Sequence, residues 1–218
     1  MDKQEIINTT VEYFKKQFSG EATGHDWFHI QRVWKLSKSI AKKEGEMDMF
    51  VVEMGALLHD IADHKFHDGD DKIGAIKTRE YLQQFEIDTQ SIDRIVQIVE
   101  EISFKGLKVP TIMSTKEGEV VQDADRLDAI GAIGVARTFA YGGSKNRPIY
   151  DPFIKPVCHT SFAAYKTSTA PTINHFYEKL LGLKDRLNTE TGKKEGERRH
   201  AFMEEFLKNF YKDWDANL

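Results

Sequence analysis

The sequence predicts an all-α protein, on three observations. Apolar residues recur every three or four positions along most of the 218 residues, as they do on the buried face of a helix. Glycines and capping residues stand between these stretches, where helices are expected to begin and end. No segment alternates apolar and polar residues strongly enough to be assigned as a strand. We therefore expect a single helical bundle with an irregular insertion and two C-terminal helices.

The composition excludes several broad classes of protein. Hydrophobic residues make up 40% and charged residues 30% of the chain, which is typical of a globular protein. A net charge of −4 is unlike the basic balance of many nucleic-acid-binding domains. Cys158 is the only cysteine, so an internal disulfide and a cysteine-based zinc site are excluded. The N-terminus lacks the apolar core of a signal peptide, and no apolar run approaches the ~20 residues of a membrane span. We expect a cytoplasmic protein that binds neither nucleic acid nor membrane.

Regular apolar spacing predicts five helices in the first half of the chain, before the last motif described below. They are expected over 6–18, 28–41, 48–58, 72–85 and 91–104, with Asp48 as the N-cap of the third. The sequence STKE at 114–117 matches a capping box, so a sixth helix should begin near Thr115. Its apolar pattern continues through Phe139, interrupted by Gly131 and Gly134. These helices form the expected core, over about 20–140.

An irregular region is expected from Gly142 to Pro171. It contains four of the five prolines and shows no clear period, which is long for a structureless loop in a compact domain. Its basic residues outnumber its one acid, Asp151; they are Lys145, Arg147, Lys155 and Lys166. We expect a mobile basic cover over an active site that binds an anion. A packed connector with solvent-facing lysines is the alternative. The two C-terminal helices, around 173–183 and over 195–214, complete the region 172–218.

The clearest chemical signal is the adjacent pair His59-Asp60, which ends an apolar run and is followed by Asp63. His59 and Asp63 share a helical face. An imidazole and a carboxylate are usual ligands for a divalent ion of intermediate softness. A His-Asp pair alone is common by chance, but two further candidate ligands occur elsewhere in this sequence. His29 lies upstream in GHDWFHI (24–30), and Asp125 lies downstream in VQDADRLD (121–128).

This order of motifs resembles that of the HD-domain metal-dependent phosphohydrolases. The longer stretches of sequence around these motifs resemble the YpgQ/YedJ-like branch of that superfamily. The resemblance covers nearly the whole chain and implies an all-helical fold. It also implies that one divalent ion is bound by His29, His59, Asp60 and Asp125. Mn²⁺ is favoured, while Mg²⁺, Co²⁺, Fe²⁺, Ni²⁺ and Zn²⁺ remain open, because the spacing alone does not choose among them. Only His64 and His67 lie between the doublet and Asp125 in the sequence, which favours a mononuclear site.

The resemblance also suggests roles for residues around the expected ion. Asp63 matches the family's carboxylate position for water activation, while the next position, His64, departs from the acid found in the alarmone hydrolases. Phosphate requires cations, so the candidate substrate-binding residues are His25, Arg32, His64, Lys65, Arg126 and Lys179. For the basic residues, an ordinary surface salt bridge is an equally good interpretation. Asp128 could orient a ligand from one turn away, whereas Asp123 is expected to be solvated or structural.

The resemblance implies metal-dependent hydrolysis of nucleotide phosphate bonds, and we expect a nucleoside triphosphate pyrophosphohydrolase. A nucleoside monophosphate phosphatase, a phosphodiesterase and a non-catalytic regulatory module that binds nucleotide or metal are alternatives. An intact set of four ligands together with Asp63 favours an enzyme over a sensor, which could lose Asp63. A di-iron oxygenase would need extra histidines that are missing here. The expected partner is a small-molecule nucleotide, and a homodimer is left open.

Overall fold

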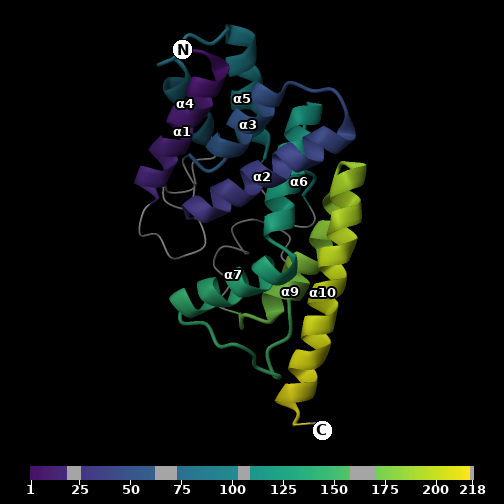
Figure 1. Ribbon diagram of the computed structural model, residues 1–218. Coiled ribbons are helices and arrows are strands. Elements are labelled where there is room, and N and C mark those ends of the chain that lie inside the picture. Colours follow the sequence, from purple (N-terminus) through teal and green to yellow (C-terminus); the bar gives the residue numbers. More distant parts are fainter. Residues whose placement is uncertain (19–25, 62–72, 103–108, 158–169, 217–218) are drawn as a thin grey trace. The chain divides into compact units, whose positions relative to one another are not determined.

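The computed structural model describes residues 1–18, 26–61, 73–102, 109–157 and 170–216, and in these residues the secondary structure is helical, without strands (Figure 1). This result confirms the all-α fold class. The chain forms two compact units. The first comprises Met1–Phe104 and Thr111–Asp125, and the second comprises Lys105–Pro110 and Arg126–Leu218. Within the described ranges, no helix combines the length and the apolar character needed to cross a membrane.

The first unit is built from six helices among its described residues. They are α1 (Lys3–Gln17), α2 (Trp27–Glu44), α3 (Met49–Leu58), α4 (Ile73–Leu82), α5 (Thr89–Glu101) and α6 (Lys116–Asp128), the last up to Asp125. An aspartate caps four of the helix N-termini by accepting hydrogen bonds from backbone N–H groups of the first turn. These caps are Asp2, Asp26, Asp48 and Asp88. The prediction of Asp48 as an N-cap is confirmed.

Helix α3 forms the centre of the first unit. Nearly all of its residues are buried, as expected of a helix that is apolar on every side. It packs against α1, α2 and α5. A Cβ added at Gly55 would lie 3.2 Å from Ile98 of α5 and 3.6 Å from Val121 of α6. The missing side chain therefore lets three helices approach closely, just before the chain reaches His59.

The second unit contains α7 (Gly131–Ser144), α9 (Asn174–Glu178), the 3₁₀ helix η2 (Leu180–Arg186) and α10 (Glu190–Trp214). Helices α7 and η2 both pack against α10. Aromatic rings fill this unit. Phe176 stacks on Phe206 with 5.7 Å between ring centroids, and Tyr150 meets Trp214 edge to face at 5.0 Å. Such pairs add to the stabilisation that burial of their area provides.

The structure corrects the predicted helix boundaries after Asp125. One helix through Phe139 is wrong, because α6 ends at Asp128 and α7 begins at Gly131, with φ of +75°. Gly134 lies inside α7 and does not interrupt it. Helix α7 also runs to Ser144, so the irregular region begins after Ser144 rather than at Gly142. A continuous helix around 173–183 is likewise wrong, because α9 gives way to η2.

The C-terminal helix begins earlier than predicted. Thr189 caps α10 by accepting a hydrogen bond from the Gly192 N–H at 2.9 Å, so this helix starts at Glu190 instead of 195. The apolar pattern alone did not reach these first turns, because they are polar and include glycines. The remaining part of the irregular region, from 158 to 169, lies outside the described residues.

Candidate metal centre

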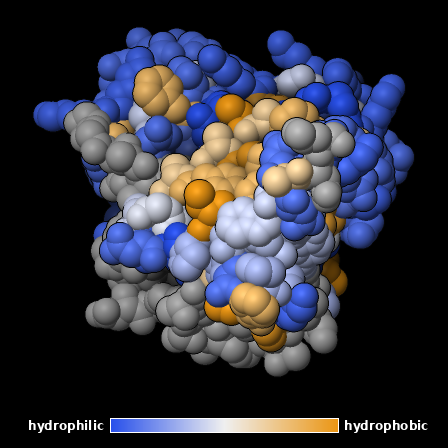
Figure 2. Space-filling model, turned by 90° about the horizontal axis from the view of Figure 1, so that it is seen from below, coloured by the Kyte–Doolittle hydropathy of each residue, from blue (hydrophilic) through white to orange (hydrophobic). Residues whose placement is uncertain are grey.

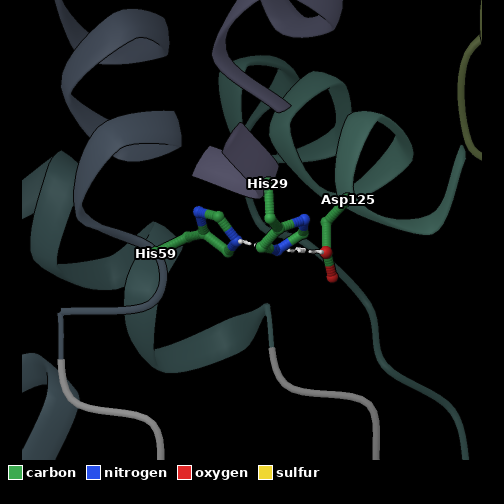
Figure 3. A group of neighbouring side chains, drawn as sticks. All are labelled: His29, His59 and Asp125. Atoms are coloured by element: carbon green, nitrogen blue, oxygen red, sulfur yellow. Dashed lines mark hydrogen bonds and ion pairs between the residues drawn. The ribbon is translucent and has the colours of Figure 1, made fainter. Parts of the chain in front are cut away.

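Three helices of the first unit bring together the side chains that the sequence singled out (Figure 3). His29 lies in the first turn of α2, where its N–H donates to the Asp26 carboxylate at 2.8 Å. His59 is the C-cap of α3, and Asp60 follows it directly. Asp125 lies on α6. The fold thus unites residues that are far apart in the sequence.

The ligand atoms of these residues converge. The two Nε2 atoms of His29 and His59 lie 3.2 Å apart. The Asp60 Oδ2 atom lies 3.4 Å from His29 Nε2 and 3.6 Å from His59 Nε2. The corresponding distances from Asp125 Oδ1 are 3.6 and 3.9 Å. The two imidazoles are within hydrogen-bond distance of each other, and the four nitrogen–oxygen distances are longer than an ordinary hydrogen bond of about 2.7–3.2 Å, as expected of groups gathered around one small site.

Burial divides the four side chains into two kinds. The imidazoles are almost fully buried, with 1% of the His29 side chain and 2% of the His59 side chain exposed. The carboxylates reach solvent, with 20% of Asp60 and 36% of Asp125 exposed. A small anion could therefore approach this group of residues from the side of the carboxylates.

A backbone carbonyl fixes the tautomer of His59. Its Nδ1 atom lies 2.8 Å from the Ala56 oxygen, which can only accept a hydrogen bond. The proton of the neutral ring is therefore on Nδ1, and Nε2 turns its lone pair toward His29 and the two aspartates. Histidines that bind metals are commonly oriented in this way by a hydrogen bond to their other nitrogen.

The donor set fits a divalent ion. Neighbouring ligands of an octahedral ion with bonds of about 2.1 Å lie about 3 Å apart, close to the observed spacing of the two Nε2 atoms. Two imidazole nitrogens and two carboxylate oxygens make a mixed site, which suits an ion of intermediate softness. Even without Asp60, the ligand atoms of His29, His59 and Asp125 all lie within 4.8 Å of one another. This part of the chain is therefore a candidate metal centre.

The structure places only some of the other predicted site residues. Asp63, His25, His64 and Lys65 lie outside the described residues. Arg32 is on α2 in the first unit and is partly exposed. Arg126 is buried and its guanidinium donates to the Arg186 backbone carbonyl in the second unit, a contact that favours a structural role. Lys179 joins α9 to η2 in the same unit. The predicted roles of these residues in substrate binding stay predictions.

The neighbouring aspartates of α6 are both buried. Asp123 is fully buried, so the solvated alternative for it is wrong and a structural role remains. Asp128 is 1% exposed and its Oδ2 atom accepts a hydrogen bond from Arg137 Nη1 at 2.7 Å. This ion pair joins the end of α6 to α7.

Sequence reasoning missed a buried charged group on α6, the helix that carries Asp125. Glu117 was interpreted as the last residue of a capping box, but Thr115 is the cap, with its Oγ1 accepting from the Gly118 N–H at 3.1 Å. The Glu117 carboxylate instead accepts from the Asp48 N–H and from Arg94. Burial opposes its ionisation, but these hydrogen bonds and the Arg94 charge hold the pKa of Glu117 below its usual value. The STKE motif did mark the start of the helix, but the sequence did not show that its glutamate pairs with Asp48 and Arg94.

Comparison with known proteins shows which family this chain is similar to. The model of the HD domain matches residues 27–130, which include all four candidate ligands. The chain is 38% identical to the uncharacterized protein YpgQ of Bacillus subtilis over 214 residues, covering 98% of this chain and 94% of that protein.

Solved structures agree with this assignment. An HD-superfamily hydrolase from Bacillus thuringiensis is 42% identical, with a TM-score of 0.76 over 99% of this chain and all of that one. Bacillus subtilis YpgQ in complex with ADP is 34% identical, with a TM-score of 0.72 over 97% of both chains. The fold is thus similar to that of known HD-domain proteins over nearly the full chain.

Proposed function

This chain belongs to the HD-domain family of hydrolases, and we propose that it cleaves nucleotide phosphate bonds with the help of one divalent metal ion. The observation that carries the proposal is the convergence of four donors from three helices. The Nε2 atoms of His29 and His59 lie 3.2 Å apart, the Asp125 carboxylate points toward them (Figure 3), and the Asp60 carboxylate lies 3.4 and 3.6 Å from the same two nitrogens. Mn²⁺ is the ion we favour for this mixed set of nitrogen and oxygen donors.

The ion would supply positive charge that polarises a phosphate and makes a water molecule more acidic. The protein side chains would orient the ligands, leave room for the substrate and supply a base. His59 is held in one tautomer by the Ala56 carbonyl, so its lone pair is oriented before any ligand arrives. Asp60 and Asp125 reach solvent and leave room for a substrate on their side. Asp63 follows the doublet by three residues, and we propose it as the base that takes a proton from the attacking water.

A nucleoside triphosphate is the substrate that we favour, with cleavage to a monophosphate and pyrophosphate. The similarity to Bacillus subtilis YpgQ, whose structure contains ADP, supports a nucleotide over other phosphate esters. A nucleoside monophosphate phosphatase or a phosphodiesterase would use the same centre, and a regulatory module would bind without turnover. A cytoplasmic location, where nucleotides are made, is part of the proposal.

A substrate panel tests this function. Purified protein is incubated with nucleoside mono-, di- and triphosphates and with cyclic dinucleotides, in Mn²⁺, Mg²⁺ or Co²⁺, and the products are separated. We expect release of pyrophosphate from triphosphates, strongest with Mn²⁺. Release of phosphate from monophosphates alone would favour the phosphatase. Binding of nucleotide without any product would favour the regulatory module.

We also propose a homodimer. One face of the molecule carries a hydrophobic area bordered by hydrophilic side chains (Figure 2). Large apolar side chains of the second unit are exposed, among them Phe153 at 92%, Val157 at 57% and Ile149 at 56%. Surfaces of this kind often mark contacts with other proteins. Light scattering after size exclusion measures the mass, and a monomer at every concentration would contradict the dimer.

A further inference from the structure

Two polar networks of the first unit join the helices that carry the candidate ligands. The first connects α2 and α3. Trp34 Nε1 donates to Glu53 Oε2 at 2.8 Å, and Lys38 Nζ lies 3.5 Å from the same oxygen. The Lys38 ammonium also lies over the Trp34 ring, 3.9 Å from its centroid. The Glu53 side chain is only 15% exposed, so one carboxylate holds two side chains of the facing helix.

The second network connects α3 with α5 and α6. Glu117 Oε1 accepts a hydrogen bond from Arg94 Nη2 at 2.5 Å and another from the Asp48 N–H at 3.1 Å. Arg94 Nη1 also lies 3.4 Å from the carboxylate of Asp48, the N-cap of α3. The Glu117 side chain is 9% exposed. A single carboxylate of α6 thus binds both the beginning of α3 and a cation of α5.

The placement of these networks matters because of what the same helices carry. His29 is on α2, His59 and Asp60 end α3, and Asp125 is on α6. Glu53 therefore joins the helices of the two histidines. Glu117 joins the helix of the doublet to the helix of Asp125. Neither carboxylate is among the four groups that converge at the candidate centre.

Apolar packing alone would not fix the ligands with the precision that a metal requires. Burial of apolar surface is itself non-directional, and the interlocking of side chains on facing helices opposes sliding without fixing a polar donor–acceptor distance. Metal–ligand bonds tolerate deviations of about 0.2 Å. Hydrogen bonds depend on distance and angle, and a rigid helix passes any shift of its register on to its end. Buried, directional contacts between the helices are therefore where register would be set.

We propose that Glu53 and Glu117 are positioning residues, which hold α2, α3 and α6 in the register that brings the four metal ligands together. The inference rests on the proposed metal centre and adds to it a set of residues that touch neither metal nor substrate. Loss of either carboxylate would leave all four ligands present but misaligned. The ion would bind more weakly, and its coordination geometry would be less uniform.

The experiment compares Glu53→Met and Glu117→Met with wild-type protein. Methionine keeps the length of the side chain and removes the hydrogen bonds. Two quantities are measured: the dissociation constant for Mn²⁺ by calorimetry, and the electron paramagnetic resonance line shape of the bound Mn²⁺. Loss of a group that is hydrogen-bonded directly to a metal ligand commonly weakens metal binding about 10–100-fold. Glu53 and Glu117 act one contact further away, so we expect an effect at the lower end, about tenfold for each variant, with broadened lines.

Tyr81→Phe is the matched control. It removes the hydrogen bond from Tyr81 to Thr10 Oγ1, 3.1 Å long and buried, which joins α4 and α1, helices without a ligand. Its melting temperature without metal should fall as in the Met variants, while its Mn²⁺ affinity and line shape stay at wild-type values. This comparison separates loss of positioning from a general loss of stability.

The possible results are distinct. If the Met variants bind Mn²⁺ with the affinity and line shape of Tyr81→Phe, the positioning role is wrong while the metal centre stands. If wild-type protein binds no Mn²⁺, the metal centre itself is wrong and the positioning role falls with it. If a Met variant does not fold, Trp34→Phe and Arg94→Lys test the same two networks. Trp34→Phe removes the hydrogen-bond donor, and Arg94→Lys removes the forked guanidinium while keeping the charge.

Discussion

The Nε2 atoms of His29 and His59 lie 3.2 Å apart, although thirty positions separate the two residues in the sequence. His29 begins α2 and His59 ends α3, and these two helices pack together. The Ala56 carbonyl accepts a hydrogen bond from His59 Nδ1 and so fixes the proton of the neutral ring on that nitrogen. The arrangement gathers two ring nitrogens beside two carboxylates, and the predictions for the metal ligands depend on it.

Removing one member of the doublet should abolish metal binding. In Asp60→Ala or His59→Ala, three donors remain and the ion loses a ligand, so we expect loss of bound metal and of hydrolysis. Helix content should stay unchanged, because both residues follow the end of α3. Metal stoichiometry, turnover and circular dichroism measure these effects. Asp93→Ala, at an exposed aspartate paired with Arg79, is the control and should behave as wild type. Normal stoichiometry and turnover in Asp60→Ala would refute the ligand assignment.

Asp63→Asn tests the proposed base. The substitution keeps the size of the side chain and removes its ability to take a proton. General acid–base groups contribute roughly 10²–10⁴-fold to rates, so kcat should fall by about that factor. Metal occupancy, measured on the same samples, should not change. A loss below tenfold would remove Asp63 from this role.

Acid should destabilise the second unit through His175. Protein atoms surround most of this ring even though part of the residue reaches solvent, and its burial, with the charges of Lys179 and Arg147, lowers its pKa from 6.5 to about 3. Between these two values the unfolded chain binds a proton that the folded chain does not. Stability therefore falls as the pH drops below 6.5, by at most about 1.4 kcal/mol per pH unit.

Urea unfolding at pH 7 and pH 5 measures this effect, with His175→Gln as the comparison. The variant should lose less stability than wild type over this interval. Glu195, whose pKa is lowered to about 2 by its hydrogen bonds from Arg198 and Arg199, contributes only below about pH 4.5, so it does not enter. An equal loss in both proteins would show that His175 is not the group that titrates.

Gly131→Ala should destabilise the junction between α6 and α7. Gly131 has φ of +75°, and an added Cβ would lie 3.0 Å from the Arg199 side chain. We expect a loss of about 1–3 kcal/mol in the free energy of unfolding, measured with urea. Gly143→Ala is the matched control in the same helix, because an added Cβ there meets nothing within 4 Å. That variant should be unchanged or about 0.5–1 kcal/mol more stable, since alanine favours the helix. Equal stability of the two variants would refute the argument.

The segment from Gly142 to Pro171, of which residues 158–169 lie outside the described part of the chain, stays predicted from its sequence to be a mobile basic cover over the metal centre. Its closure on an anion would exclude water and then allow release of product. Limited proteolysis should cut it readily in the free protein. Metal together with a non-hydrolysable nucleotide should protect it. Cleavage at the same rate with and without these ligands would instead favour a packed connector.

The sequence alone determined the helical class, most of the helices of the first unit and the order of the four ligand candidates. Apolar periodicity and N-caps such as Asp48 are local, so they can be read without knowing what lies across the core. His29, the His59-Asp60 pair and Asp125 were found because their residue types and order are distinctive. The same local patterns predicted one helix through Phe139 that Gly131 interrupts, without showing that α6 stops before it.

Only the tertiary structure decided which groups meet. Glu117 contacts the Asp48 N–H, 69 positions away in the sequence, and Arg126 is buried against the Arg186 carbonyl instead of being open to solvent. The His59 tautomer likewise depends on the exact end of α3, where the Ala56 carbonyl becomes available. Such contacts arise from packing between distant segments, which no short window of sequence contains. The sequence therefore determined which residues are present, and the packing of the helices determined which of them face one another.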